Sequence, residues 1–305
     1  MRVLLTGATG FIGSHVARRF LAEGHTVAAV VRRQSSRWRL HDIESGLDFI
    51  PGDINHIDDW HGRINQIGAD VCLHLAWDST NGWSAPNAVD SAADSLRFAR
   101  AVLESGCKRL VVAGSSFEYE AMDEPLKEDS LVRPQDLYGA AKHAVHLVAA
   151  QLARMNGASL AWLRIFNTYG PYDDERRLVP SIVRTLLRDE CLATTAGAQI
   201  RDYTHVEDVA SAIVKVAESP YDGPINIASG VAVSVRDVAV TTARLLGKAD
   251  KLQLGVLPYP KSEPMMNRAD VRRLREDIGW VPRYDLEGGL AQTVRWLTEW
   301  YGQKV

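Results

Sequence analysis

The sequence predicts an α/β fold: a doubly wound parallel sheet with helices on both faces, followed by a smaller α/β C-terminal lobe. Short apolar runs alternate with amphipathic stretches through the first half of the 305 residues, a pattern typical of a parallel sheet covered on both sides. Glycines at three-residue spacing (Gly7, Gly10 and Gly13) separate the first apolar run from the first amphipathic one. The second half lacks such regular alternation, which indicates a lobe of different construction.

The opening turn is suited to hold phosphate groups. Arg2–Leu5 is predicted as a buried strand and Ser14–Ala22 as a helix with apolar residues at i, i+3 and i+4 spacing. Without side chains at the glycines, backbone N–H groups can approach a pyrophosphate, whose charge the helix N-terminus stabilises. This predicts a dinucleotide-binding, Rossmann-like domain, with cofactor contacts from Gly7, Thr9, Gly10, Phe11, Ile12 and Gly13.

The second predicted strand, His25–Val31, ends without an acid. In NAD-binding folds a carboxylate at this strand end accepts hydrogen bonds from the ribose 2′-OH. Here Val31 is followed by Arg-Arg-Gln-Ser-Ser, whose guanidinium and hydroxyl groups would hold a 2′-phosphate. We therefore predict NADP as the cofactor, with NAD possible, and assign Arg32, Arg33 and Ser35 to it. A solvated basic loop is the alternative.

Composition narrows the class of protein. The net charge of −3 and pI near 6.3 argue against general nucleic-acid binding. Apolar runs are too short to span a bilayer, and because the first residues already match a strand, we expect no signal peptide. Three cysteines and no Cys/His cluster of metal-ligand spacing predict a reducing compartment and no metal site. We expect a cytoplasmic protein without nucleic-acid or membrane partners.

Further strands and helices alternate along the chain. Long helices are predicted at Ala88–Ser105 and Leu137–Met155, and strands at Leu47–Ile54, Ala69–Ala76, Arg109–Gly114, Leu160–Ile165 and Ile225–Ser229. Ligands bind at the C-terminal ends of such strands. Asp53 could pair with the adenine amino group and Ala76 could pack near the ribose, although each could be an ordinary loop residue. The cofactor residues assigned at these ends are Asp53, Ile54, Leu75, Ala76 and Phe166.

After Phe166 the pattern loosens into a second lobe. Leu178–Arg188 and Val209–Glu218 are predicted helices, and residues 230–305 are predicted as short helices with Pro-rich joints. We expect residues 1–166, with about 202–229, to form the NADP-binding domain. Residues 167–201 and 230–305 are expected to form a substrate-binding lobe that caps the cleft.

A tyrosine and a lysine on one helix face suggest proton transfer. Tyr138 and Lys142 lie four residues apart at the start of a predicted helix. The ammonium would lower the pKa of the phenol, which could then exchange a proton with a carbinol or ketone oxygen. Lys142 could also bind the nicotinamide ribose, so both residues are assigned to catalysis and to the cofactor. The end of the preceding strand offers the hydroxyls of Ser115 and Ser116 to a substrate oxygen.

Motifs along the chain resemble, in content and order, those of the extended short-chain dehydrogenases/reductases. They are TGATGFIG from Thr6, GDI from Gly52, HLA from His74, GSSFEY from Gly114, YGAAK from Tyr138, RIFNTYGP from Arg164 and RDYTHVEDV from Arg201. Within that superfamily the chain resembles the nucleotide-sugar epimerase/dehydratase/4-ketoreductase group.

The resemblance implies a Ser–Tyr–Lys active site and a nucleotide-diphosphate sugar as substrate. The catalytic hydroxyl is then Ser115, four residues before Tyr119, with Ser116 as the alternative if the register slips by one. Asn167 and Arg201 match substrate-diphosphate positions, Arg268 is the candidate for a late arginine, and Ser116 is assigned to the substrate. A salt-bridged surface arginine is the alternative for Arg201 and Arg268. The resemblance also implies a homodimer formed through the two long helices.

Departures from the family pattern narrow the activity. The 4,6-dehydratases carry Thr-Asp-Glu where this chain has Ser115-Ser116-Phe117. Glu118 comes one position too late, unless the register shifts by one residue. We predict an NADPH-dependent reductase of a 4-keto nucleotide-sugar, of the 4-keto-6-deoxyhexose type. The alternative is a nucleotide-sugar 4-epimerase that uses NAD(P) as an internal redox cofactor. A cofactor-sensing protein without catalysis is less favoured, because Tyr138 and Lys142 are both retained.

Overall fold

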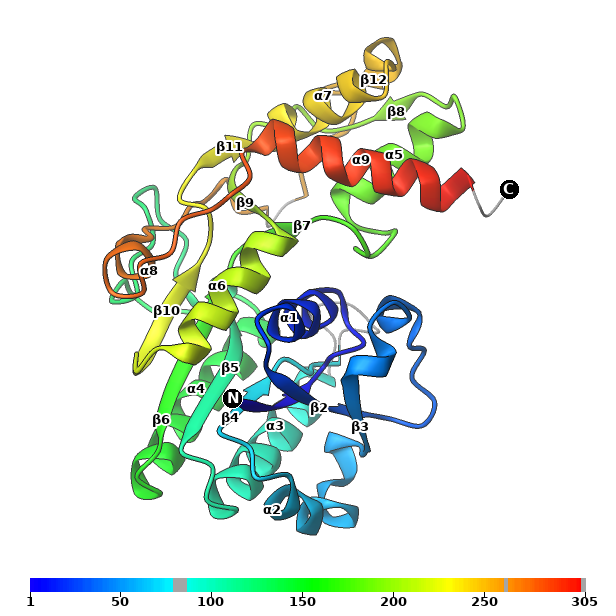
Figure 1. The fold of residues 1–305 in the computed structure, drawn as a ribbon. Coiled ribbons are helices and arrows are strands. Elements are labelled where there is room, and N and C mark those ends of the chain that lie inside the picture. Colours follow the sequence, from blue (N-terminus) through cyan, green and yellow to red (C-terminus); the bar gives the residue numbers. More distant parts are fainter. Residues whose placement is uncertain (79–86, 261–262, 303–305) are drawn as a thin grey trace.

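A seven-stranded parallel sheet forms the base of the molecule in the computed structural model, which describes residues 1–78, 87–260 and 263–302 (Figure 1). Its order is β3-β2-β1-β4-β5-β6-β10, and every neighbouring pair is parallel. The strands are β1 Arg2–Thr6, β2 Thr26–Val31, β3 Leu47–Pro51, β4 Val71–His74, β5 Arg109–Ser115, β6 Ser159–Ile165 and β10 Gly223–Ile227. The chain reverses direction across the sheet between β1 and β4, so the predicted doubly wound sheet is confirmed.

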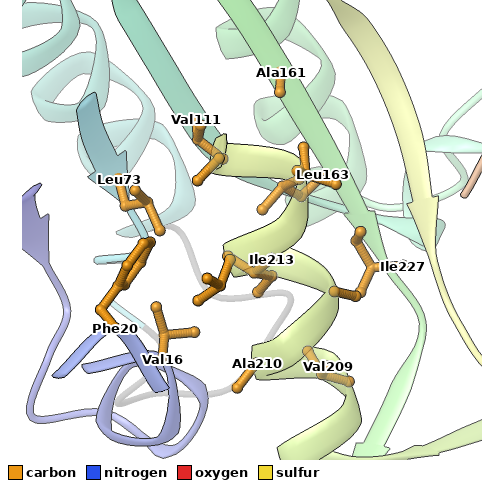
Figure 2. Packing of buried hydrophobic residues seen from close by; sticks show 14 of the residues in the cluster. Val16, Phe20, Leu73, Val111, Ala161, Leu163, Val209, Ala210, Ile213 and Ile227 are labelled. Atoms are coloured by element: carbon orange, nitrogen blue, oxygen red, sulfur yellow. The ribbon is translucent and has the colours of Figure 1, made fainter. Parts of the chain in front are cut away.

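Helices cover both faces of this sheet. On one face, α1 (Phe11–Ala22) and α6 (Val206–Glu218) pack together against inward residues of the strands, as Figure 2 shows. On the other face lie α2 (Ile64–Ile67), α3 (Asn87–Glu104) and α4 (Leu137–Met155). Successive residues of a strand point to opposite faces, so Leu5 joins the first core and Leu4 the second. Burial on both faces explains why these strands are continuous apolar runs.

The second lobe is built around a small sheet. In it, β9 (Ile200–His205) pairs with β7 (Asn167–Tyr169), β11 (Ala232–Ser234) and β13 (Met266–Asn267). Its other elements are α5 Leu178–Leu187, β8 Leu192–Ala193, α7 Val235–Leu245, β12 Leu252–Gln253 and α9 Leu286–Gly302. The short helix α8 (Arg272–Glu276) instead packs beside β10, at the edge of the large sheet. Residues 202–205 thus belong to a strand of this small sheet, whereas α6 and β10 return to the large one.

The prediction of only short helices after residue 230 is wrong, because α9 has 17 residues. Two adjacent glycines, Gly288 and Gly289, lie in the first turns of α9, where Asp285 accepts a hydrogen bond from the Gly288 N–H at 2.7 Å. A side chain at Gly289 would overlap the Tyr169 hydroxyl. The glycine therefore serves close packing of α9 onto β7.

An aromatic cluster joins the two lobes. Trp38, in the segment between β2 and β3, stacks on Trp300 of α9 with ring centroids 4.7 Å apart, and Trp300 stacks in turn on Trp296. Tyr172, in the loop after β7, contacts both Trp38 and Trp296 edge-on. Arg39 donates a hydrogen bond to the Tyr172 carbonyl at 2.9 Å. The segment that follows Arg32 and Arg33 is therefore fixed against the second lobe.

None of the helices in the described part of the chain is both long and apolar enough to cross a membrane.

Candidate active site

A cavity of about 490 Å³ lies at the C-terminal ends of β1, β2, β3 and β4. This is where the strand order reverses, the place at which open α/β sheets bind ligands. Nine residues that the sequence assigned to the cofactor line it: Gly7, Thr9, Gly10, Arg32, Ser35, Asp53, Ile54, Leu75 and Ala76. The structure therefore brings together residues that lie up to 69 positions apart in the chain.

The glycine-rich turn has the shape needed to hold a pyrophosphate. Gly10 caps α1 without a side-chain hydrogen bond, so no side chain competes for the N–H groups of Phe11, Ile12 and Gly13 in the first turn. Gly7 has a positive φ of 78°, and a Cβ there would lie 2.7 Å from the Ala76 nitrogen. A Cβ at Gly13 would overlap the Gly7 carbonyl. The helix starts three residues earlier than expected, because Gly10 and not Gly13 is its cap.

The end of β2 lacks an acid, as the sequence indicates. Val31 lines the cavity there, beside Arg32 and Ser35. Arg32 Nε donates to Ser35 Oγ at 3.4 Å. Arg33 is exposed and lies outside the cavity lining. The structure thus places one of the two predicted arginines at the site.

Ser115 and Tyr138 meet beyond this cavity. Ser115 ends β5, and Tyr138 lies in the first turn of α4, which Asp136 caps by accepting from the Gly139 N–H at 2.7 Å. Burial raises the pKa of Tyr138 well above its usual range, while a side-chain hydrogen bond with Ser115 and the charge of Arg177 act in the opposite direction. The predicted serine–tyrosine pair is therefore formed, in a closed and largely apolar setting.

Lys142 lies one turn further along α4 and does not face the phenol directly. Its ammonium donates to the Ala113 carbonyl at 2.8 Å and lies over the Trp77 ring, 3.8 Å from the centroid. The Tyr138 ring centroid is 5.9 Å away. Burial lowers the pKa of Lys142 to about 7. The expected ammonium effect on the Tyr138 pKa therefore requires a shift of Lys142 from this position.

Trp77 separates the cavity from the serine–tyrosine pair. Its indole lines the cavity and meets the Tyr138 ring edge-on at 5.8 Å between centroids. Seven of the residues assigned to the cofactor are outside the lining: Phe11, Ile12, Gly13, Arg33, Tyr138, Lys142 and Phe166. Phe166 is buried in the core beside α6.

The small sheet brings several predicted substrate residues near the active site. Arg201 on β9 pairs in register with Asn267 on β13, and the Asn267 amide donates to Ser116 Oγ at 3.1 Å. Arg201 forms an ion pair with Glu263 at 2.7 Å and also donates to the Pro264 carbonyl. Asn167 holds a buried amide nitrogen without a hydrogen-bond partner among the described residues. Unsatisfied buried donors of this kind are suited to a ligand.

Arg268 has a different environment from that of Arg201. It donates to the Asp123 carbonyl at 2.8 Å, and its own main chain pairs with Leu126. Its contacts are thus with the loop that precedes α4, and its assignment to the substrate stays a prediction.

Comparison with known proteins identifies the family. Residues 3–228 match the sequence model of the NAD dependent epimerase/dehydratase family. The chain belongs to this family. Its relatives include the UDP-glucose 4-epimerase of Mycolicibacterium smegmatis, 29% identical, with 97% of this chain and 98% of that protein aligned. The predicted relationship to the extended short-chain dehydrogenases/reductases is confirmed, and the chain is an enzyme of that type.

Solved structures agree with the fold and with this family. MoeE5 in complex with UDP-glucose and NAD is 31% identical, with a TM-score of 0.84 and 99% of this chain and 100% of that chain covered. The UDP-glucose 4-epimerase of Thermotoga maritima has a TM-score of 0.88 over 99% of this chain and 100% of that chain. At 24% identity the latter shows the fold only.

Several site residues of this epimerase/dehydratase family member were not found by sequence reasoning. Trp77 follows the HLA motif directly, and Arg176 reaches the cavity from the charged loop after β7. Asn267 precedes the predicted Arg268 by one position. Each was adjacent to a recognised motif or candidate, but no local pattern indicated which neighbour would face the site.

The family member also contains a group of potential metal ligands behind the active site. Glu118, His143 and His146 have ligand atoms within 4.8 Å of one another. Glu118, however, already accepts hydrogen bonds from the Arg164 guanidinium and from Trp162. A cation there would meet a carboxylate whose charge is already neutralised, so the geometry does not favour a metal.

Proposed function

We propose that this enzyme is a nucleotide-sugar 4-epimerase that acts on a UDP-hexose or UDP-hexuronic acid and uses NAD(P) as an internal redox cofactor. The observation that carries the proposal is the Ser115–Tyr138 hydrogen bond, with Lys142 one turn further along α4. This acid/base pair lies beyond the cavity, on the far side of Trp77. Epimerisation at C4 requires one group to remove and return the same hydroxyl proton. Two relatives that align over nearly their whole length, a UDP-glucose and a UDP-glucuronate 4-epimerase, support this choice.

Each residue has a role in this proposal. When bound, the nicotinamide ring supplies a reversible hydride acceptor. Tyr138 takes the proton from the 4-hydroxyl and returns it after the 4-keto sugar has rotated within the site. Ser115 orients that oxygen. Lys142 is the cation on the same helix face that can bring the raised pKa of Tyr138 back toward neutrality.

Elimination of water has less support. A dehydratase needs an additional acid and base beside the substrate, and the turn after β5 offers Ser116 and Phe117 at the corresponding positions. Glu118, the nearest acid in the sequence, is buried and bonded to the main chain of Ser115. It is therefore not available to a sugar.

A second candidate, an NADPH-dependent 4-ketoreductase, is favoured by one observation. Val31, Arg32 and Ser35 line the cavity at the end of β2, where no acid would repel a 2′-phosphate. A net reductase consumes an exchangeable reduced cofactor, and NADPH suits that role. The reductase activity is tested below by NADPH oxidation with a 4-keto sugar, and the preference for NADP is tested separately by cofactor titration.

The proposal extends to the division into domains, the oligomeric state and the compartment. We propose that residues 1–166 with about 202–229 hold the cofactor, and that residues 167–201 and 230–305 hold the nucleotide sugar. A homodimer through α3 and α4 is supported by exposed apolar side chains along α4: Leu137, Leu147, Val148 and Met155. The free, buried thiols of Cys72 and Cys107 fit a reducing compartment such as the cytoplasm.

The direct test is incubation of the purified enzyme with UDP-glucose, UDP-galactose and UDP-glucuronate, followed by proton NMR of the sugar. We expect the 4-epimer to appear without net change in the cofactor. Tyr138→Phe keeps the ring and removes the proton, so turnover should fall by about 10²–10⁴-fold while the fold is retained. Stoichiometric NADPH oxidation with a 4-keto sugar, and no epimer from any 4-hydroxy sugar, would replace this proposal with the reductase.

A further inference from the structure

Glu118 is a fully buried acid directly behind the proposed active site. It lies in the 3₁₀ turn Ser116–Glu118, which connects β5 to Tyr119, and its side chain is 0% exposed. A buried carboxylate is costly unless it is paired and hydrogen-bonded. Glu118 therefore needs specific hydrogen-bond and ion-pair partners in this turn.

The partners come from two strands. Glu118 Oε1 accepts from the Ser115 main-chain N–H and from Trp162 Nε1, each at 2.8 Å. Glu118 Oε2 accepts from Arg164 Nε at 3.2 Å. Arg164 is also buried, and it anchors itself by donating to the Glu128 carbonyl at 2.9 Å. The carboxylate is thus neutralised on the β6 side and bonded to the chain on the β5 side.

The same turn is fixed on the side of α4. The Phe117 carbonyl packs so closely on Gly139 that a Cβ there would overlap it. Gly139 directly follows Tyr138. On the other side of the turn, Ser115 Oγ accepts from the Phe117 N–H at 3.2 Å. The turn therefore sets the position of Ser115 relative to Tyr138.

We propose that Glu118 is a positioning residue for the reaction: its carboxylate, paired with Arg164, holds the main chain of Ser115 so that the Ser115 hydroxyl meets that of Tyr138. The inference rests on the proposed roles of Ser115 and Tyr138. A displacement of about 1 Å at such a pair can cost about 10²-fold in rate.

The charge of Glu118 also acts on the site. Ionisable groups face it from β6, from its own turn and from α4: Arg164, Tyr119, Tyr138, Lys142, His146 and His143, whose Nδ1 lies 3.9 Å away. Burial is the main influence on both neighbouring groups: it raises the pKa of Tyr138 and lowers the pKa of Lys142. The negative charge of Glu118 raises both pKa values. Removal of that charge should therefore lower both.

Glu118→Gln tests the proposal while keeping the side-chain shape. We expect kcat to fall by about 10–10²-fold with little change in KM, and both limbs of the pH–rate profile to move to lower pH. A merely structural role would reduce the yield of folded protein and leave the profile in place. The matched control is Glu120→Gln, which removes an ion pair with Arg133 outside this network and should leave kcat, KM and the profile unchanged.

A substrate-independent measurement separates this proposal from the proposed function. In the ¹⁵N-labelled enzyme we expect slow hydrogen exchange at the Ser115 amide, and faster exchange in Glu118→Gln. If no UDP-sugar is turned over, the proposed function fails, while exchange at the Ser115 amide still decides whether Glu118 holds Ser115.

If Glu118→Gln does not fold, Trp162→Phe is the second variant, because it removes one hydrogen-bond donor to Glu118 and keeps the charge. It should lower kcat without moving the pH profile. The proposal is overturned if the Ser115 amide of Glu118→Gln exchanges as slowly as in the parent enzyme, or if that variant keeps the parental kcat and pH profile. It is also overturned if Trp162→Phe keeps both the parental kcat and the parental exchange rate at Ser115.

Discussion

The ammonium nitrogen of Lys142 lies 3.8 Å from the centroid of the Trp77 indole ring. Attraction to the ring face and the hydrogen bond to Ala113 partly offset the cost of burying this cation. Burial nevertheless lowers its pKa to about 7. Near neutrality, Lys142 therefore exchanges between a charged and a neutral form, and in the proposed mechanism only the charged form assists Tyr138.

The stability of the enzyme should record this titration. The lysine is protonated in the unfolded chain up to about pH 10.4, but in the folded chain only below about pH 7. Between these values the unfolded state binds more protons, so stability relative to Lys142→Met should rise with pH, on the order of 1.4 kcal/mol per pH unit at most. Urea unfolding at several pH values measures the difference. A difference that is constant from pH 7 to 10 would contradict the lowered pKa.

Cofactor preference should depend on Arg32 more than on Arg33. Arg32 lines the cavity next to Ser35, whereas Arg33 is exposed outside it. We expect NADP(H) to bind at least about tenfold more tightly than NAD(H), which is about 1.4 kcal/mol. Arg32→Ala should remove most of that preference and leave NAD affinity intact, and Arg33→Ala is the matched control. Equal titration curves for the two cofactors in the parent enzyme would refute the assignment.

The substrate diphosphate and the Glu263 carboxylate should compete for Arg201. Arg201 is paired with Glu263 at 2.7 Å, so a diphosphate that binds Arg201 must replace this carboxylate. Arg201→Ala should weaken UDP binding by about 1.5–3 kcal/mol, the value of a charge-assisted hydrogen bond. Glu263→Gln should instead strengthen it, as measured by calorimetry. Weaker UDP binding by Glu263→Gln would mean that Glu263 orients Arg201 for the ligand. Loss of NADP affinity in Arg201→Ala would assign Arg201 to the fold or the cofactor.

The two adjacent serines should behave differently. Ser115 shares a hydrogen bond with Tyr138, whereas Ser116 accepts one from Asn267. Ser115→Ala should therefore reduce kcat, and Ser116→Ala should act mainly on KM for the nucleotide sugar. Steady-state kinetics of both variants measures kcat and KM and tests this expectation. The opposite order would move the catalytic hydroxyl to Ser116.

Local patterns were sufficient for most of the large sheet and for the cofactor turn. Alternating apolar and amphipathic runs located β1 to β6 and β10, because strands buried on both faces must be apolar along their length. Glycine spacing located the phosphate turn, because the backbone conformation at Gly7 requires glycine. The same local reasoning failed after residue 230, where only short helices were expected and α9 has 17 residues. Within α9, Gly289 allows close contact with Tyr169.

The sequence by itself determined the family and the sheet, because motifs and apolar runs depend on neighbours a few residues apart along the chain. It also singled out Ser115, Tyr138 and Lys142, whose catalytic roles stay predictions. Only the tertiary structure decided how these side chains are held. Glu118 meets Arg164 across 46 positions of sequence, and Arg201 meets Glu263 across 62. Such pairs form because separate strands and loops are brought to one edge of the sheets, and no periodicity or spacing in the chain encodes which charged side chains will then face each other.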